Sequence, residues 1–170
     1  LFLIFIWLAI VLTSKSQVGE GKKYDCVQLT NLTPKQRLAN YPFNKAYRIQ
    51  LLSFPAKTLN LPLLDGRVDC NQVKDSIPLH SNEIHSLTNI LFNVGCRTNK
   101  IVKNISTAVG VDVAIIFIGS SNELIDYIEI CFDCREIDLY LSKRNNTIGM
   151  PCNQRLIKLK QFAKACTLQL

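Results

Sequence analysis

The sequence predicts an α+β domain: an antiparallel sheet with a central hairpin, one face of which is packed by two or three helices. A Val/Ile-rich hairpin pattern at residues 111–141 favours this class, as do apolar patterns of helical period at 82–94 and 153–169. The order of strand, helix, hairpin and helix fits two packed layers. We expect a single domain over residues 26–170.

The first sixteen residues predict the cellular compartment of the protein, and the compartment decides whether its cysteines are expected to be oxidised. Residues 1–12 are an unbroken apolar run. The run is shorter than the ~20 residues that cross a hydrocarbon core, but it matches the apolar part of a secretory signal. Small residues at Ser14 and Ser16 favour cleavage there. We therefore predict a signal peptide at 1–16, a flexible leader at 17–25, and export to the periplasm or out of the cell, with an uncleaved membrane anchor as the alternative.

Two elements are predicted before residue 55. Thr33 followed by Pro34 is typical of an N-cap and a first helical turn, and it predicts a short helix as far as Asn40. Alternating polarity over residues 45–54 predicts a strand. The side chains expected to point inward are Tyr47, Ile49 and Leu51.

The middle of the chain predicts a loop and a helix. Three prolines and Asp65-Gly66 make residues 55–78 a turn-rich connection with room for a short strand. Ser81 is expected to cap a helix over 82–94, and Gly95 to end it in the left-handed conformation. The apolar arc of this helix is expected to hold Ile84, Leu87, Ile90, Leu91 and Val94. The polar arc is expected to hold Asn82, His85, Ser86, Asn89 and Asn93.

The hairpin pattern contains an internal change of phase. Residues 111–118 predict one strand, 119–122 have turn composition, and 124–141 continue as an apolar-alternating run. Apolar side chains are even-numbered up to Phe132 and odd-numbered from Ile137, so a bulge or a tight turn is required between them. The helix that follows at 153–169 is expected to pack on the sheet through Leu156, Leu159, Phe162, Ala163, Cys166 and Leu170.

The sequence Cys131-Phe132-Asp133-Cys134 is the one motif with chemical potential. A structural role is favoured, either as a local disulfide or with each cysteine in a separate longer bridge, because cysteines are oxidised outside the cytosol. A thiol redox pair and a zinc site are alternatives, although the motif lies in β sequence beside acids and no second C-x-x-C supplies further ligands. The other cysteines that could form disulfides are Cys26, Cys70, Cys96 and Cys152. Seven cysteines cannot all pair within one chain, and Cys166 is expected to be a buried free thiol.

Positive charge gathers at the C-terminal end of a chain whose formal net charge is +7. Residues 139–170 contain no acid, and their bases are Lys143, Arg144, Arg155, Lys158, Lys160 and Lys164. This region could bind an anionic surface or an envelope component, or it could be a solvated helix face. Export argues against nucleic acid as a partner.

No motif points to catalysis. G-x-S-x-G, H-E-x-x-H, P-loop and G-x-G-x-x-G patterns are absent, and His80 and His85 favour solvated roles over metal binding. We therefore expect no cofactor and no metal, and a structural or binding role. Glycosylation triplets begin at Asn31, Asn104 and Asn145, and they matter only in a eukaryotic source.

The stretch from Ile130 to Cys134, after the Ala114-Ile-Ile-Phe117 strand, resembles a group of small, uncharacterised exported bacterial proteins. The hairpin of that group carries an Ile-Cys-Phe-(Glu or Asp)-Cys signature. The resemblance implies an envelope location and an α+β fold, and it implies no activity.

Overall fold

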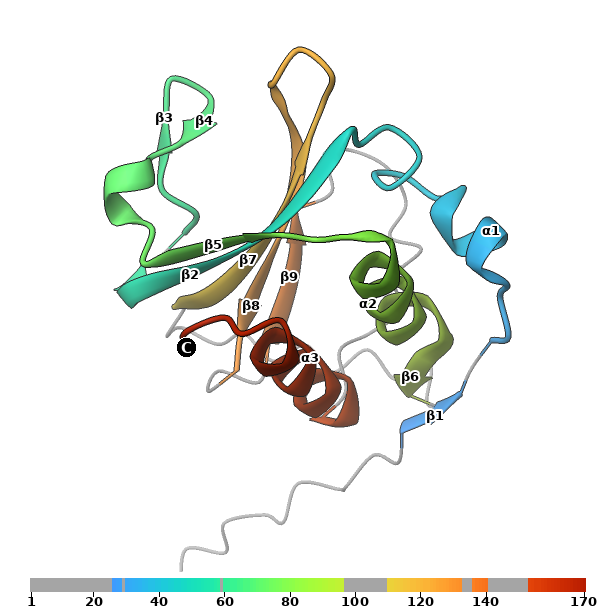
Figure 1. Cartoon of the computed structure of the whole chain (residues 1–170). Helices are drawn as coiled ribbons and strands as arrows, with labels where there is room; N and C mark the ends of the chain where they lie inside the picture. The colour runs from blue at the N-terminus through green and yellow to red at the C-terminus, as the bar shows by residue number, and fades with distance from the viewer. Residues whose placement is uncertain (1–25, 29, 59, 97–109, 133–135, 141–152) are drawn as a thin grey trace, which may run out of the picture.

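The structure is a computed structural model, and it describes residues 26–28, 30–58, 60–96, 110–132, 136–140 and 153–170. It confirms the α+β class: an antiparallel sheet, small two-stranded sheets and three α-helices (Figure 1). The predicted signal peptide and leader lie outside the described residues. In chain order the elements are β1 (Cys26–Gln28), α1 (Pro34–Leu38), β2 (Arg48–Thr58), β3 (Leu63–Leu64), β4 (Arg67–Val68), the 3₁₀ helix η1 (Cys70–Gln72), β5 (Asp75–Pro78), α2 (Ser81–Asn93), β6 (Val94–Cys96), β7 (Val111–Ile118), β8 (Leu124–Cys131), β9 (Glu136–Tyr140) and α3 (Asn153–Ala165).

The main sheet has the strand order β5-β2-β7-β8-β9, and every neighbouring pair is antiparallel. The central strand β7 pairs with β2 on one side and β8 on the other. All its residues are buried except the half-buried Asp112. This pattern fits a strand covered on both faces, for which a nearly continuous apolar run is expected.

The phase change in the sequence falls between two strands. Within the run at 124–141 the structure describes β8 and β9, which pair with each other. Ile130 pairs with Ile137, and Cys131 pairs with Glu136. Antiparallel partners therefore have numbers of opposite parity, and partners share a face of the sheet. Even-numbered residues of β8 and odd-numbered residues of β9 thus lie on one face, as the sequence pattern required.

Helices cover one face of the sheet, as predicted. Figure 1 shows α2 and α3 together on one side, with α1 beside α2. Side chains of β2, β7 and β8 meet the helices in one cluster, whose largest fully buried members include Leu51, Leu87, Ile115, Phe117, Ile128 and Leu159. The predicted inward position of Tyr47 is wrong. Its side chain is 80% exposed, because Tyr47 precedes the first residue of β2.

The short helix α1 forms as its sequence predicts. Thr33 is the N-cap and Pro34 is the first helical residue. The Oε1 atom of Gln36 accepts a hydrogen bond from the backbone N–H of Thr33 at 2.8 Å, which completes a capping box.

The ends of α2 differ from the prediction. The N-cap is His80 and not Ser81, and the backbone N–H of His80 donates to Oε2 of Glu83 at 2.8 Å. Gly95 does not end the helix in the left-handed conformation, because the chain passes directly into β6, where Gly95 pairs with Val27 of β1. Asn93, expected on the solvated arc, is buried because its side chain bonds residues 30–32.

The other face of the sheet is covered in part by the connection from β2 to β5. This connection holds β3, β4 and η1, so the region predicted as a loop with a short strand is more regular than expected. Asp65 and Gly66 both have positive φ, at 51° and 74°, and they form the two-residue turn of the β3–β4 hairpin. The hairpin projects from the sheet on the side away from α2 and α3 (Figure 1). Within the described part of the chain, none of the helices is both long and apolar enough to cross a membrane.

Candidate functional site: a pocket on the open face of the sheet

A cavity of about 590 Å³ lies between the sheet and the β3–β4 hairpin. Its wall comes from five strands, from η1 and from the turn after β7. The volume falls within the range of small-molecule sites, which is about 300–1,000 Å³. The lining residues are Arg48, Gln50, Leu52, Arg67, Val68, Cys70, Val73, Lys74, Asp75, Ser76, Ile116, Ile118, Asn122 and Leu124.

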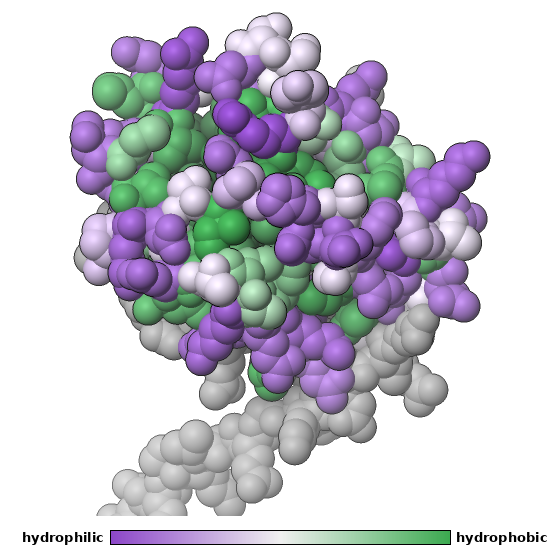
Figure 2. All heavy atoms as spheres, in the orientation of Figure 1, coloured by the Kyte–Doolittle hydropathy of each residue, from purple (hydrophilic) through white to green (hydrophobic). Residues whose placement is uncertain are grey.

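The floor of the pocket is apolar because of the two-residue period of the strands. Alternate residues of β2 and β7 face the helices, and the residues between them face the pocket. Leu52, Ile116 and Ile118 on the pocket side are buried in a second apolar cluster, against which Val68 and Leu124 pack. Figure 2 shows hydrophobic residues among hydrophilic ones over the β3–β4 hairpin and the adjoining sheet.

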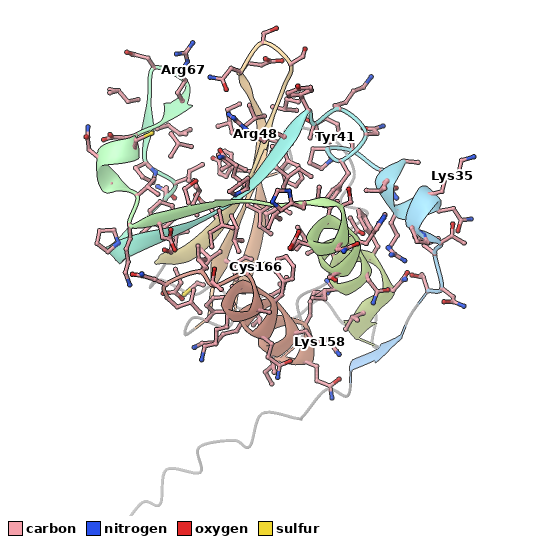
Figure 3. The ribbon with its side chains drawn as sticks, viewed as in Figure 1. Lys35, Tyr41, Arg48, Arg67, Lys158 and Cys166 are labelled. Atoms are coloured by element: carbon pink, nitrogen blue, oxygen red, sulfur yellow. The ribbon has the colours of Figure 1, made fainter. Side chains whose placement is uncertain are left out.

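Cationic side chains border this floor. Figure 3 shows Arg48 on β2 and Arg67 on the β3–β4 hairpin, on the side of the sheet away from α2 and α3. Arg48 donates a hydrogen bond from Nη2 to Oδ1 of Asn122 at 2.9 Å. A guanidinium has five N–H donors, so this bond leaves capacity for a ligand. Lys74 supplies a third positive charge to the lining.

The one carboxylate in the lining, Asp75, is engaged with backbone groups. Its Oδ1 accepts from the N–H of Ser76 at 2.9 Å, and its Oδ2 accepts from the N–H of Gln169 at 3.2 Å. The charged groups of the lining are therefore three cations and one hydrogen-bonded anion. This arrangement favours an anionic ligand.

The η1 segment holds one side of the pocket in place. Asp69 caps η1, and its pKa is lowered because its carboxylate accepts from the side chain of Gln72 and from the backbone N–H of Asn71, both at 3.0 Å. The N–H of Lys74 donates to the carbonyl of Ser53 at 2.8 Å, which joins the end of this segment to β2.

The cysteines have different environments. Cys131 is buried at the end of β8 and takes part in a disulfide bond. Its partner is not among the other described cysteine side chains, because Cys70 and Cys166 are both free. Cys70 was expected to be available for a disulfide, but the structure has it as an exposed thiol in the pocket lining.

Cys166 is a free thiol, as predicted, but it is half-buried rather than buried. Burial raises the pKa of the Cys166 thiol above its ordinary value, and the negative charge of Glu83 acts in the same direction. The thiolate, which is the reactive form, is therefore disfavoured at this position.

The predicted pair of Cys131 with Cys134 is not tested, because Cys134 and Cys152 lie outside the described residues. The redox and zinc roles remain predictions for the same reason. No group of three or more possible metal ligands occurs within the described ranges. Cys131 ends a strand, and a strand end lacks the helix dipole that lowers the pKa of a redox cysteine. His80 is exposed at the cap of α2 and His85 is half-buried on that helix.

The basic C-terminal region is divided by burial. Lys158, Lys160 and Lys164 are exposed on α3, and the ammonium of Lys160 lies 5.3 Å from the centre of the Phe132 ring. Arg155 is only 2% exposed, so it does not belong to a basic surface. Lys143 and Arg144 lie outside the described residues.

Two buried acids of β8 were not identified from the sequence. Asp126 and Glu129 are both buried, although acidic side chains in a strand are usually exposed. Glu129 accepts a hydrogen bond through Oε1 from the backbone N–H of Leu61, which joins the start of the β3–β4 connection to the sheet. Glu129 is odd-numbered, so its side chain lies on the face of the sheet opposite Ile128 and Ile130. This was the one signal in the sequence that Glu129 lies on the face that the β2–β5 connection covers.

Comparison with known protein families, with curated proteins and with solved structures finds no match to this chain. The resemblance to exported bacterial proteins therefore remains a prediction.

Proposed function

We propose that this protein is an exported, non-catalytic binding domain that holds an amphipathic organic anion in the pocket on the open face of the sheet. The observation that supports the proposal is the combination of an apolar floor and a cationic border in one cavity. The apolar part of the ligand lies over Leu52, Ile116 and Ile118. Its acidic group lies within reach of Arg48 and Arg67.

The two parts of the pocket contribute differently to binding. Burial of apolar ligand surface provides about 25 cal/mol per Å², whatever the head group. The three cationic side chains are exposed, so each contributes about 1 kcal/mol or less. Most of the affinity therefore comes from the apolar body, and the cations select an acid over a neutral compound of the same length.

Calorimetric titration of decanoate and decanol tests this selection. We expect decanoate to bind more tightly. We expect the backbone amide NMR signals of the protein that shift on its addition to be those of Leu52, Ile116 and Ile118. Arg48→Gln and Arg67→Gln should each weaken decanoate binding by about two- to fivefold and leave decanol unchanged. Lys158→Gln on α3 is the matched control and should change neither affinity.

A variant that fills the cavity tests the floor separately. Val73→Phe replaces a small side chain of the lining with an aromatic ring. It should weaken the binding of decanoate and of decanol alike. The proposal fails if neither compound binds, if the shift changes map to α2 and α3, or if the arginine substitutions leave decanoate affinity unchanged.

Export is tested by the mass of the protein recovered outside the producing cells. We expect a chain that starts at Gln17. Recovery with residues 1–16 attached would contradict cleavage, and retention in the cytosol would contradict export.

A further inference from the structure

The register of the small β1–β6 sheet places two cysteines opposite each other. Cys26 is the partner of Cys96, Val27 of Gly95, and Gln28 of Val94. Directly opposed residues of an antiparallel pair have Cα atoms about 4.5 or 5.5 Å apart. Both separations lie within the range of about 4.4–6.8 Å that a disulfide bridges. We propose that Cys26 and Cys96 form a disulfide that joins the N-terminal strand to the end of α2.

Described side chains next to this pair fix the register. Thr30 donates from Oγ1 to the carbonyl of Phe92 at 2.7 Å. The side chain of Asn93 accepts from the N–H of Leu32 at 3.0 Å and donates to the carbonyl of Leu32 at 3.1 Å. Arg155 of α3 donates from Nε to the carbonyl of Val94, the first residue of β6, at 2.7 Å. A slip of β1 along β6 would break the bonds to Asn93, so the two cysteines stay opposed.

The disulfide forms by two thiol–disulfide exchanges with an oxidant of the disulfide class, such as oxidised glutathione. The thiolate of one cysteine attacks the oxidant, forms a mixed disulfide and releases one glutathione thiol. The thiolate of the second cysteine then attacks the mixed disulfide, forms the Cys26–Cys96 bond and releases the second glutathione thiol. The protein loses two electrons and two protons, and one oxidant disulfide becomes two thiols.

This pairing limits how the other cysteines connect. Cys70 and Cys166 are free, and Cys131 already has a partner. With Cys26 and Cys96 joined to each other, Cys131 must pair with Cys134 or Cys152. The remaining one of those two is then the third free thiol of the chain.

Peptide mapping without reductant tests the connectivity of the full chain after oxidation with glutathione. Trypsin separates Cys26 (residues 24–35), Cys96 (75–97), Cys152 (145–155) and the Cys131–Cys134 segment (104–135) into different peptides. We expect peptide 24–35 linked to peptide 75–97. Recovery of these two peptides unlinked, or linked to any other cysteine peptide, would overturn the proposal.

A second measurement applies if substitution lowers the yield of folded protein. The bond closes a loop of about 70 residues, so its reduction in the wild type should lower the midpoint of thermal unfolding by about 5–15 °C. In the double variant Cys26→Ser with Cys96→Ser, reductant can break only the Cys131 disulfide. It should therefore lower the midpoint of thermal unfolding by less than it does in the wild type. Cys70→Ser is the matched control and should respond to reductant as the wild type does. Equal responses of the double variant and the wild type would contradict the bond.

Discussion

The guanidinium of Arg155 donates from Nε to the backbone carbonyl of Val94 at 2.7 Å, and its Nη2 donates to the same oxygen. Val94 opens β6 directly after α2, so these bonds join α3 to the end of α2. A cationic side chain that looks like a surface residue in the sequence therefore belongs to the packing between two helices.

Replacing Arg155 should destabilise the fold. In Arg155→Met the apolar chain fills most of the space, but the half-buried Val94 carbonyl loses the donors that Arg155 supplies. We expect the free energy of unfolding, measured by urea denaturation with circular dichroism, to fall by about 2–3 kcal/mol. Lys158→Met on the same helix is exposed and should change this energy by less than about 0.5 kcal/mol. Equal effects of the two substitutions would contradict the assigned role of Arg155.

Substitution of Phe117, which makes an aromatic contact in the helix-side core, should also destabilise the fold. Phe117 is fully buried, and its ring lies edge to face with that of Phe43 at 4.9 Å between centroids. Phe117→Ala should lower the free energy of unfolding by about 3–5 kcal/mol, because it leaves a cavity in the core between β7 and the helices. Tyr47→Ala, one residue before β2, should cost little. A stable Phe117→Ala protein with an unchanged denaturation midpoint would refute this packing.

The two described free thiols should differ in reactivity. Iodoacetamide reacts with thiolates, and the raised pKa of Cys166 together with its partial burial keeps that thiol protonated near neutral pH. We expect Cys70 to be alkylated first, as measured on tryptic peptides 68–74 and 165–170. The difference should narrow as the pH rises toward the pKa of Cys166. Faster reaction at Cys166 at neutral pH would contradict its environment.

The cap of η1 should depend on pH. The pKa of Asp69 is lowered in the folded protein, so at acid pH the folded state binds fewer protons than the unfolded state. The contribution of the cap is therefore present above the ordinary carboxyl pKa of 3.8 and is lost as the pH falls through the lower folded value. The amide NMR signal of Asn71 should report this transition, and Asp69→Asn should remove it. A transition centred above 3.8 would contradict the direction of the shift.

Residue patterns over a few neighbouring positions were sufficient to predict where some helices and strands begin and end. Thr33 and Pro34 marked the start of α1, and the parity change between Phe132 and Ile137 marked the boundary between β8 and β9. Gly95 misled, because a glycine at a helix end is common in the left-handed conformation, whereas here pairing with Val27 keeps the chain extended.

The candidate site was not predictable in the same way. Arg48 and Arg67 are 19 residues apart in the sequence, and they line one cavity because the β3–β4 hairpin folds back over the sheet. Nothing in the local pattern of 55–78 indicates which face that connection covers. The burial of Asn93 also depends on residues about 60 positions earlier.

Because β7 is buried on both faces in the folded protein, its apolar side chains are exposed until folding is complete. Seven of its eight residues are apolar and Asp112 is its only charge, which is the composition of segments that self-associate into cross-β aggregates when exposed. Refolding yield should therefore fall as chain concentration rises. As the one charged residue of the strand, Asp112 should oppose this association.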